Sequence, residues 1–392
     1  MVIYVHIPFC VKKCDYCDFL SAPSDDFTRA EYVKCIMKEL KHYGRIYGVN
    51  ARNIQVTSIF FGGGTPSLLE AEQIADILSC IKENFNIEEC AEITMECNPG
   101  TLTETKLIGY RKSGVNRLSI GLQSANDAEL KAIGRIHTFD EFMSGYQMAR
   151  KCGFENINVD LMSALPGQTI ESYAKTINKI LSVKPQHISA YSLILEEGTP
   201  LYERIENLEK VGKITGLPDE DTEREMYYLT ERLLGEAGYK RYEISNYAIP
   251  GYECRHNTAY WQRDNYLGVG IGAASCMDDV RMKNVVDLRY YMDVCNNIEK
   301  NICEVIDETE TDVLTKNDMM SEFMFLGLRM MKGISKEEFE RQFKVSYNDI
   351  YGRVTDKLIK EGLLSESLDK DRLCLTPLGI DVSNMVLAQF VV

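Results

Sequence analysis

The sequence has no run of 18 or more apolar residues, and its first six residues include no Lys or Arg. It therefore lacks the marks of a membrane-spanning helix and of a secretory signal, and we expect a cytoplasmic protein that is not integral to a membrane. Basic residues are a minority, with 44 Lys and Arg against 59 Asp and Glu and a net charge of −15. This acidity disfavours nucleic acid as a partner, because nucleic-acid binding normally uses a basic surface.

A disulfide framework is not expected either, although the chain has 13 cysteines. That number is odd, and six of them stand singly within apolar patterns, which is typical of buried thiols in a reducing compartment. These six are Cys35, Cys80, Cys152, Cys295, Cys303 and Cys374. With 45% hydrophobic and 26% charged residues, the chain has the composition of a globular protein, and its 392 residues are enough for one large α/β unit and a smaller appendage.

Strand-like and helical segments alternate through the first half of the chain. The predicted strands cover 2–7, 56–61, 91–97, 117–122, 156–162 and 186–195, and the predicted helices cover 29–47, 71–83, 104–112, 139–151 and 170–181. This order predicts an α/β fold with a parallel sheet, either doubly wound or closed into a complete or partial barrel.

The alternation weakens after residue 201, and three domains are predicted. Residues 1–240 form the α/β unit, 241–310 form an irregular connecting region, and 311–392 form a small, mainly helical domain. In this last domain helical segments at 320–331, 336–343 and 350–361 precede a strand-like segment at 373–376 and a final helix. The order suggests a winged-helix-like module.

Cys10, Cys14 and Cys17 form a C-x3-C-x2-C pattern in the loop after the first predicted strand. Three thiolates supply three ligands for the four irons of a [4Fe–4S] cluster, which leaves one iron open to an exogenous ligand. A partial zinc site and a chance pattern are the alternatives. Zinc normally takes a fourth protein ligand, and the nearest candidate, His6, lies on a predicted strand.

Unusual residues also mark the ends of several predicted strands, where ligands bind in parallel α/β folds. The sequence Gly62-Gly63-Gly64-Thr65-Pro66 follows the second strand, and its glycines would let the backbone approach a ligand. Glu96 ends the third strand and could accept hydrogen bonds from ribose hydroxyls. Taken singly, the glycine segment could be a tight turn and Glu96 a solvated charge.

Residues 4–10, Tyr-Val-His-Ile-Pro-Phe-Cys, together with Cys14, Tyr16 and Cys17, resemble the radical S-adenosylmethionine superfamily, within it the branch of the oxygen-independent coproporphyrinogen III oxidases. The resemblance implies a partial (β/α)6 TIM-like barrel in which the open iron chelates the amino and carboxylate groups of S-adenosylmethionine. It also implies a set of contacts for one or two S-adenosylmethionine molecules, with Tyr16 near the adenine. These candidates are Tyr4, Tyr16, Gly63, Gly64, Thr65, Glu96, Gln123, Arg135 and Asp160.

A second motif lies in the predicted connecting region. His256, Asn257, Tyr260 and Trp261 match the H-N-x-x-Y-W signature of the HemW-type haem chaperones, which the chain therefore resembles. His256 could offer an imidazole nitrogen to haem iron, while Tyr260 and Trp261 offer flat faces to a macrocycle. Cys254 is a secondary thiolate candidate. In general, a lone His beside aromatic residues is more often a core residue.

The expected function is that of a haem chaperone that binds haem, a [4Fe–4S] cluster and S-adenosylmethionine and passes haem to an acceptor haemoprotein. The alternative is oxygen-independent coproporphyrinogen III oxidase, an enzyme that decarboxylates propionate side chains. Two departures disfavour it: Phe19 stands where those enzymes carry a further cysteine, and only nine residues precede Cys10. A nucleic-acid interaction protein, suggested by the C-terminal module, is disfavoured by the acidity. Whether the chain is an enzyme stays open.

Overall fold

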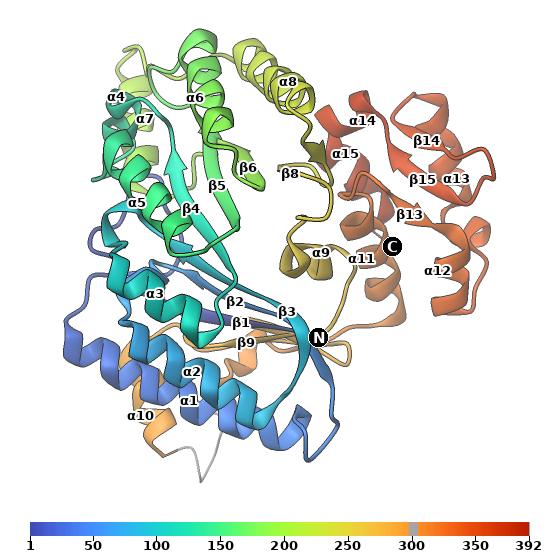
Figure 1. The fold of residues 1–392 in the computed structure, drawn as a ribbon. Coiled ribbons are helices and arrows are strands. Elements are labelled where there is room, and N and C mark those ends of the chain that lie inside the picture. The colour runs from blue at the N-terminus through green and yellow to red at the C-terminus, as the bar shows by residue number, and fades with distance from the viewer. Residues whose placement is uncertain (298–304, 392) are drawn as a thin grey trace.

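The computed structural model describes residues 1–297 and 305–391. Its main feature is a curved sheet of 12 strands in the order β12-β11-β10-β9-β1-β2-β3-β4-β5-β6-β8-β7. Helices cover the outer side of this sheet, and a separate C-terminal unit lies beside α9 (Figure 1). The sheet ends at β12 and β7, so hydrogen bonds do not close it into a full barrel.

Six neighbouring strands at the centre of the sheet run parallel, as the sequence predicts. They are β1 (Val2–Ile7), β2 (Gln55–Gly63), β3 (Asn86–Cys97), β4 (Arg117–Gln123), β5 (Asn156–Ser163) and β6 (His187–Ser192). The helices between them are α1 (Asp26–Tyr47), α2 (Ala71–Asn84), α3 (Glu104–Ser113), α4 (Asp127–Ala132), α5 (Phe139–Lys151) and α6 (Ile170–Val183). The predicted α/β fold with a partial barrel is therefore confirmed.

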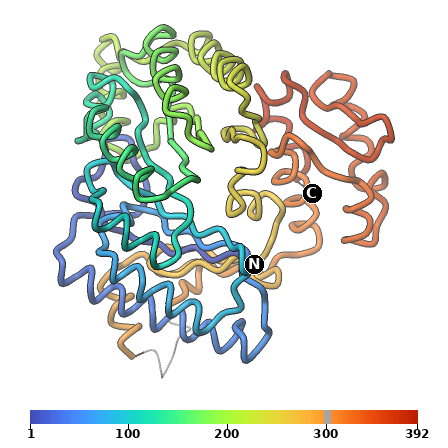
Figure 2. Tube along the Cα trace, in the orientation of Figure 1, coloured from blue at the N-terminus to red at the C-terminus, as the bar shows by residue number. Residues whose placement is uncertain are grey.

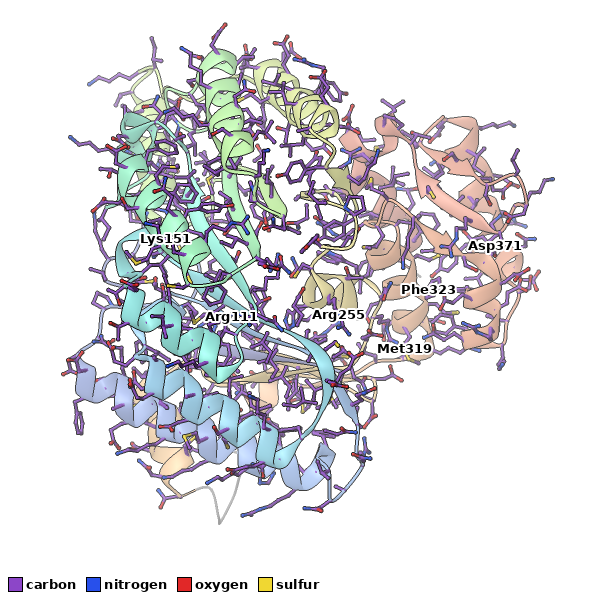
Figure 3. The ribbon with its side chains drawn as sticks, viewed as in Figure 1. Arg111, Lys151, Arg255, Met319, Phe323 and Asp371 are labelled. Atoms are coloured by element: carbon purple, nitrogen blue, oxygen red, sulfur yellow. The ribbon has the colours of Figure 1, made fainter. Side chains whose placement is uncertain are left out.

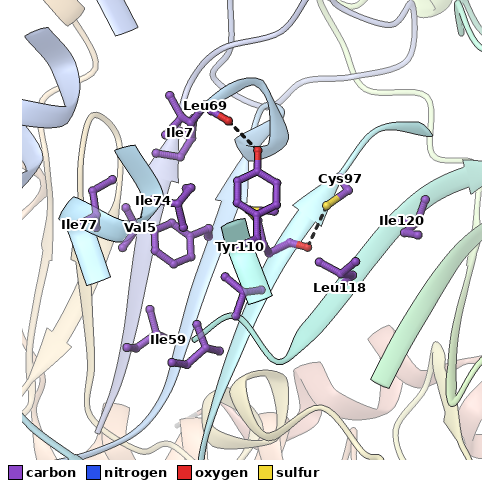
Figure 4. Close-up of a cluster of buried hydrophobic side chains, with 14 of the residues drawn as sticks. Val5, Ile7, Ile59, Leu69, Ile74, Ile77, Cys97, Tyr110, Leu118 and Ile120 are labelled. Carbon is purple, nitrogen blue, oxygen red and sulfur yellow. Dashed lines mark hydrogen bonds between the residues drawn. The ribbon is translucent and has the colours of Figure 1, made fainter. Parts of the chain in front are cut away.

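Alternation along these strands separates an apolar outer face from a polar inner face, because successive side chains point to opposite sides of a strand. Outward residues such as Val5, Ile59 and Leu118 are fully buried and pack with residues of α2 and α3 in one hydrophobic cluster (Figure 4). Inward residues such as Glu96 and Asp160 line cavities instead. Burial of the outer face stabilises the barrel and leaves its concave side available for a polar site.

The region 241–310 differs from the irregular connection that the sequence predicts. Its described residues form β8 (Asn246–Ala248), α9 (Arg255–Trp261), β9 (Tyr266–Val269), β10 (Ala274–Met277), β11 (Val280–Lys283) and α10 (Leu288–Asn296). Strand β9 pairs in parallel with β1, so the chain returns to its own first strand (Figure 2). These strands have only four residues each or fewer, too few to show a clear alternation.

Two helices connect the central strands to this region: α7 (Pro200–Lys210) and α8 (Glu220–Glu236), followed by β7 (Lys240–Arg241). The C-terminal unit begins after β12 (Asp312–Val313) and has a three-stranded antiparallel sheet in the order β13-β15-β14. Its elements are α11 (Lys316–Gly327), β13 (Ile334–Ser335), α12 (Lys336–Phe343), α13 (Tyr347–Lys360), β14 (Leu364–Glu366), β15 (Arg372–Leu375), α14 (Pro377–Asp381) and α15 (Ser383–Leu387). The unit has its own hydrophobic core.

Within the described part of the chain, the cysteines are free thiols. Of the six expected to be buried, Cys35, Cys80 and Cys295 are buried, whereas Cys152 and Cys374 are half-buried, so the prediction is wrong for these two. Cys303 lies outside the described residues. None of the described helices combines the length and the apolar character that a membrane crossing requires.

Candidate functional site

The three cysteines of the C-x3-C-x2-C pattern lie on a loop that backbone hydrogen bonds hold in place. The N–H of Cys10 donates to the carbonyl of Ala22 at 3.1 Å, and the N–H of Ala22 donates to the carbonyl of Pro8 at 2.9 Å. Farther along, the N–H of Asp15 donates to the carbonyl of Ile133 at 3.1 Å. The loop is therefore fixed to itself and to the segment after α4.

The thiols of Cys10, Cys14 and Cys17 are half-buried and line one cavity of about 580 Å³, called here the cysteine cavity. Burial raises the pKa of Cys14 and Cys17, and neighbouring thiols add to the shift. In the described residues no three His, Cys, Asp or Glu side chains are grouped as a site for a single metal ion. Soft thiolates on one cavity wall are a donor set that suits an iron–sulfur cluster.

The fourth ligand considered for zinc, His6, has both ring nitrogens engaged. Its Nε2 lies 2.9 Å from the carbonyl oxygen of Leu20, and its Nδ1 lies 3.1 Å from the hydroxyl of Tyr4. A carbonyl only accepts, so Nε2–H donates and Nδ1 accepts from Tyr4 in the neutral ring. Burial lowers the pKa of His6, which favours this neutral form.

The glycine segment after β2 is pressed against the cysteine loop and β1. Gly64 N–H donates to Ile7 at 2.8 Å, and Thr65 N–H donates to Phe9 at 2.7 Å. A Cβ on Gly63, whose φ is +107°, would lie 2.3 Å from the His6 ring. Close packing against the loop thus already requires glycine, as expected for a tight turn. The same turn lines the cysteine cavity.

Two carboxyl groups face each other across the inner side of the sheet. Burial, followed by the charge of Asp160, raises the pKa of Glu96 to about 8. Glu96 accepts a hydrogen bond from the N–H of Gly63 at 3.1 Å. Asp160 accepts from Asn158 Nδ2 at 2.7 Å and from Ser119 Oγ at 3.3 Å, and burial raises its pKa too. Both carboxyl groups line the cysteine cavity.

The remaining candidates for nucleoside contact, apart from Tyr4, line the same cavity. Arg135 Nη1 donates to Asn98 Oδ1 at 2.8 Å, and its guanidinium carbon lies 6.0 Å from the centre of the Tyr16 ring. Gln123 follows a register shift in β4 and has a φ of +74°, a conformation that non-glycine residues rarely adopt. Tyr4 lines a different, adjoining cavity, where the centre of its ring lies 6.2 Å from the centre of the Phe60 ring.

Helix α9 carries the H-N-x-x-Y-W motif and begins at Arg255 (Figure 3). The backbone N–H groups of Arg255 and His256 both donate to the buried carboxylate of Glu92, each at 3.2 Å. His256 is 2% exposed, and its Nδ1 lies 2.9 Å from Ser58 Oγ. Its Nε2 has no hydrogen-bond partner among the described residues. Burial, with a contribution from Arg117, lowers the pKa of His256 to about 3, so the imidazole is neutral and able to bind a metal.

His256 lines a cavity of about 390 Å³, called here the histidine cavity. This cavity shares part of its wall with the cysteine cavity. The shared residues are Phe19, Gly63, Glu96, Ser119, Asp160 and Tyr191. The cysteine loop and α9, far apart in the sequence, therefore face adjoining spaces inside the barrel.

The two aromatic residues of the motif differ in the cavities that they line. The ring of Tyr260 lies 5.1 Å from that of His256 and lines both the histidine cavity and a third cavity. Trp261 lines only the third of these cavities, where the guanidinium of Arg329 lies 4.4 Å from its ring. The thiol of Cys254 donates to Glu92 at 3.5 Å and lines none of these three cavities.

Sequence reasoning missed three residues of this region. Arg117 is 2% exposed, lies 4.0 Å from Glu92 and lines the histidine cavity. Tyr191, on β6, lines all three cavities, and Arg329 comes from the C-terminal unit. A signal for Arg117 is its alternation with Ser119, Gly121 and Gln123 along a strand whose other residues are apolar.

Comparison with known proteins finds relatives that match nearly the whole chain. The Radical SAM superfamily matches residues 4–180, and the HemN C-terminal domain matches residues 314–382. The chain is 36% identical to heme chaperone HemW of Lactococcus lactis, over 99% of this chain and 96% of that protein. It is 33% identical to heme chaperone HemW of Escherichia coli, over 94% and 92%. The structure of E. coli coproporphyrinogen III oxidase (HemN), a radical SAM enzyme, shares the fold with a TM-score of 0.83 at 23% identity, covering 100% of this chain and 89% of that chain.

Proposed function

Because this chain belongs to the HemW family of haem chaperones, which has the radical SAM fold, we propose that it binds haem and passes it to an acceptor haemoprotein. One observation carries the proposal: His256, a neutral histidine whose Nε2 has no hydrogen-bond partner among the described residues, lines a cavity that shares a wall with the cysteine cavity. The protein can thus hold an axial ligand for haem iron next to a site for an iron–sulfur cluster. We also propose that the transfer of haem takes place in the cytoplasm.

In this proposal Cys10, Cys14 and Cys17 hold a [4Fe–4S] cluster. The chemistry supplied by such a cluster is one-electron reduction of the sulfonium group of S-adenosylmethionine. The chain's own part is to fix the loop, through the carbonyl of Ala22, and to lose the thiol protons on binding. Glu96 would accept ribose hydroxyls.

The other polar groups of the cysteine cavity would orient S-adenosylmethionine. Arg135 is held by Asn98 and leaves its Nε without a partner among the described residues, so it keeps a donor for a carboxylate. The guanidinium of Arg135 lies over the ring of Tyr16 and holds it in place, so that the ring offers a flat surface to the adenine. Thr65 and Gln123 would complete the wall.

The test is a haem titration of the protein after anaerobic reconstitution with iron and sulfide, followed by a porphyrinogen assay on the same sample. We expect about one haem per chain and no conversion of coproporphyrinogen III. His256→Ala should weaken haem binding at least ten-fold, because it removes the iron ligand. His42→Ala, a change on α1 outside the three cavities, is the matched control and should bind as the native chain does.

Three results would contradict the proposal. Absence of haem binding by the reconstituted protein removes the chaperone function. Unchanged affinity in His256→Ala removes His256 as the ligand. Formation of protoporphyrinogen IX would favour the alternative, the oxygen-independent coproporphyrinogen III oxidase.

A further inference from the structure

The third cavity lies between α9 and the C-terminal unit and has a volume of about 450 Å³. We call it the seam cavity. Trp261 lines it from α9, while Leu326 and Arg329 line it from the C-terminal unit. It adjoins the histidine cavity, since Tyr191, Asn257, Tyr260 and Tyr266 line both.

Two buried hydrogen-bond donors of the seam cavity are unused. Neither Trp261 Nε1 nor Arg329 Nε has a hydrogen-bond partner within the described residues, and both atoms are shielded from water. The two side chains stack on each other at 4.4 Å. Buried donors are normally hydrogen-bonded, so a structure that keeps two unpartnered donors side by side points to a missing acceptor.

The guanidinium of Arg329 is positively charged, so the acceptor that suits it best is an anion. The other two guanidinium groups of the cavity, on Arg263 and Arg281, both pair with Glu322. The carboxylate that Arg329 approaches belongs to Glu243, at 3.8 Å, and burial raises the pKa of that residue. Of the three guanidinium groups that line the cavity, that of Arg329 therefore has the longest ion-pair distance to a carboxylate. A carboxylate has two oxygens, one for each free donor, and forms strong hydrogen bonds with a guanidinium.

We propose that the seam cavity binds a carboxylate side chain of a tetrapyrrole, with Arg329 Nε–H and Trp261 Nε1–H as its donors. The proposal rests on the proposed haem-binding function and extends it: the C-terminal unit contributes a binding residue, and the ligand is selected by its acidic side chains. The aromatic residues shared with the histidine cavity would contact the macrocycle between its iron and this carboxylate.

Two probes test the proposal on the full-length protein: haem and haem dimethyl ester, which has the same iron and ring without ionised carboxylates. We expect the native chain to bind haem at least ten-fold more tightly than the ester, measured by the Soret band. Arg329→Gln should weaken haem binding about ten-fold and leave ester binding unchanged. Trp261→Phe keeps the ring but removes the N–H, and should weaken haem binding about three-fold without affecting the ester.

Arg341→Gln is the matched control, because Arg341 belongs to the same unit but is exposed and pairs with Glu338 on its own helix. It should leave both affinities unchanged. Equal affinity of the native chain for haem and ester overturns the proposal, and so does a loss in Arg329→Gln and Trp261→Phe that is the same for both ligands. If the native chain binds neither ligand, the haem-binding function itself fails and this inference fails with it. Circular dichroism of each variant shows whether it is folded.

Discussion

Among single residues, Glu96 leads to a testable prediction for pH dependence. Its carboxyl group lies inside the barrel near Asp160, and its pKa is raised from an ordinary 4.5 to about 8. The folded state therefore holds the proton more tightly than the unfolded state does. The contribution of Glu96 to the free energy of unfolding is therefore complete below about pH 4.5 and is lost as the pH rises through about 8.

Glu96→Gln should flatten this dependence, because glutamine resembles the neutral carboxyl and does not titrate. In the metal-free protein, the free energy of unfolding of the native chain should fall between pH 5 and 8 more steeply than that of the variant, by up to about 1.4 kcal/mol per pH unit. Urea unfolding at four pH values measures this. Glu72→Gln, at an exposed position of α2, should keep the native slope. Equal slopes for Glu96→Gln and the native chain would refute the shifted pKa.

The cysteines give a second prediction at this scale. Serine at Cys10, Cys14 or Cys17 should remove most of the iron and acid-labile sulfide after reconstitution, because each thiolate would supply one of three ligands. Cys90→Ser is the control, since Cys90 is an exposed free thiol outside the cysteine cavity. A full cluster content in the Cys14→Ser protein would exclude Cys14 as a ligand.

Site residues that belong to a recognisable sequence motif could be predicted from the sequence, whereas site residues outside such a motif could not. The spacing of Cys10, Cys14 and Cys17 gives their shared loop without knowledge of the fold. Tyr191 and Arg329 show no such pattern, because only the paths of β6 and α11 bring them to α9. That Tyr260 lines the histidine cavity while Trp261 does not was also unpredictable, since adjacent helical residues point about 100° apart into surroundings that only the fold defines.

At the scale of elements, α9 is a short helix held by one buried carboxylate. Glu92 accepts hydrogen bonds from two of its backbone N–H groups and lies 4.0 Å from the buried guanidinium of Arg117. A helix of seven residues is too short to be stable by itself, so its position depends on these contacts.

Glu92→Ala should lower the free energy of unfolding by about 3–5 kcal/mol, because it leaves Arg117 buried and unpaired and the helix start without an acceptor. Chemical denaturation measures the loss. Replacing both partners, Glu92→Met with Arg117→Met, should recover part of it. Arg255→Ala removes the partly exposed pair with Glu88 and an exposed hydrogen bond to the carbonyl of Cys90, and should cost less than about 1 kcal/mol. A loss below 1 kcal/mol in Glu92→Ala would show that α9 is held by other contacts.

Long elements of the barrel were predictable because local chemistry marks them. Thr138 caps α5 and Thr169 caps α6 with side-chain hydrogen bonds, and both helices are amphipathic. Strands β9 and β10 were not predictable, since both are short and the glycines in their connection are required by tertiary contacts. Gly270 has a φ of +99°, and a Cβ there would lie 2.4 Å from the Tyr32 hydroxyl.

For the molecule as a whole, the C-terminal unit is joined to the barrel by a buried ion-pair group. Glu322 of α11 is 5% exposed and pairs with Arg263 at 2.7 Å and with Arg281 of β11. Trp261, the only tryptophan of the chain, lies close by in the seam cavity. Its fluorescence therefore reports the attachment of the unit.

Glu322→Ala should loosen this attachment, because Arg281 loses its carboxylate partner and Arg263 keeps only Asp279. We expect a shift of tryptophan emission to longer wavelength and an unfolding midpoint several degrees lower, with the histidine cavity losing haem affinity as a secondary effect. Glu337→Ala, an exposed change on α12, should leave emission and midpoint unchanged. Native emission in Glu322→Ala would mean that the ion pairs do not hold the unit.

The return of β9 to β1 has a consequence for biosynthesis. Val2 to Val5 pair on one side with β2 and on the other with Tyr266 to Val269, which leave the ribosome far later. Until then the first strand of the nascent polypeptide presents an open edge of amide and carbonyl groups, the usual template for aggregation. Translation of roughly the first two thirds of the chain must therefore be completed before the strand that leads into the cysteine loop is protected on both sides.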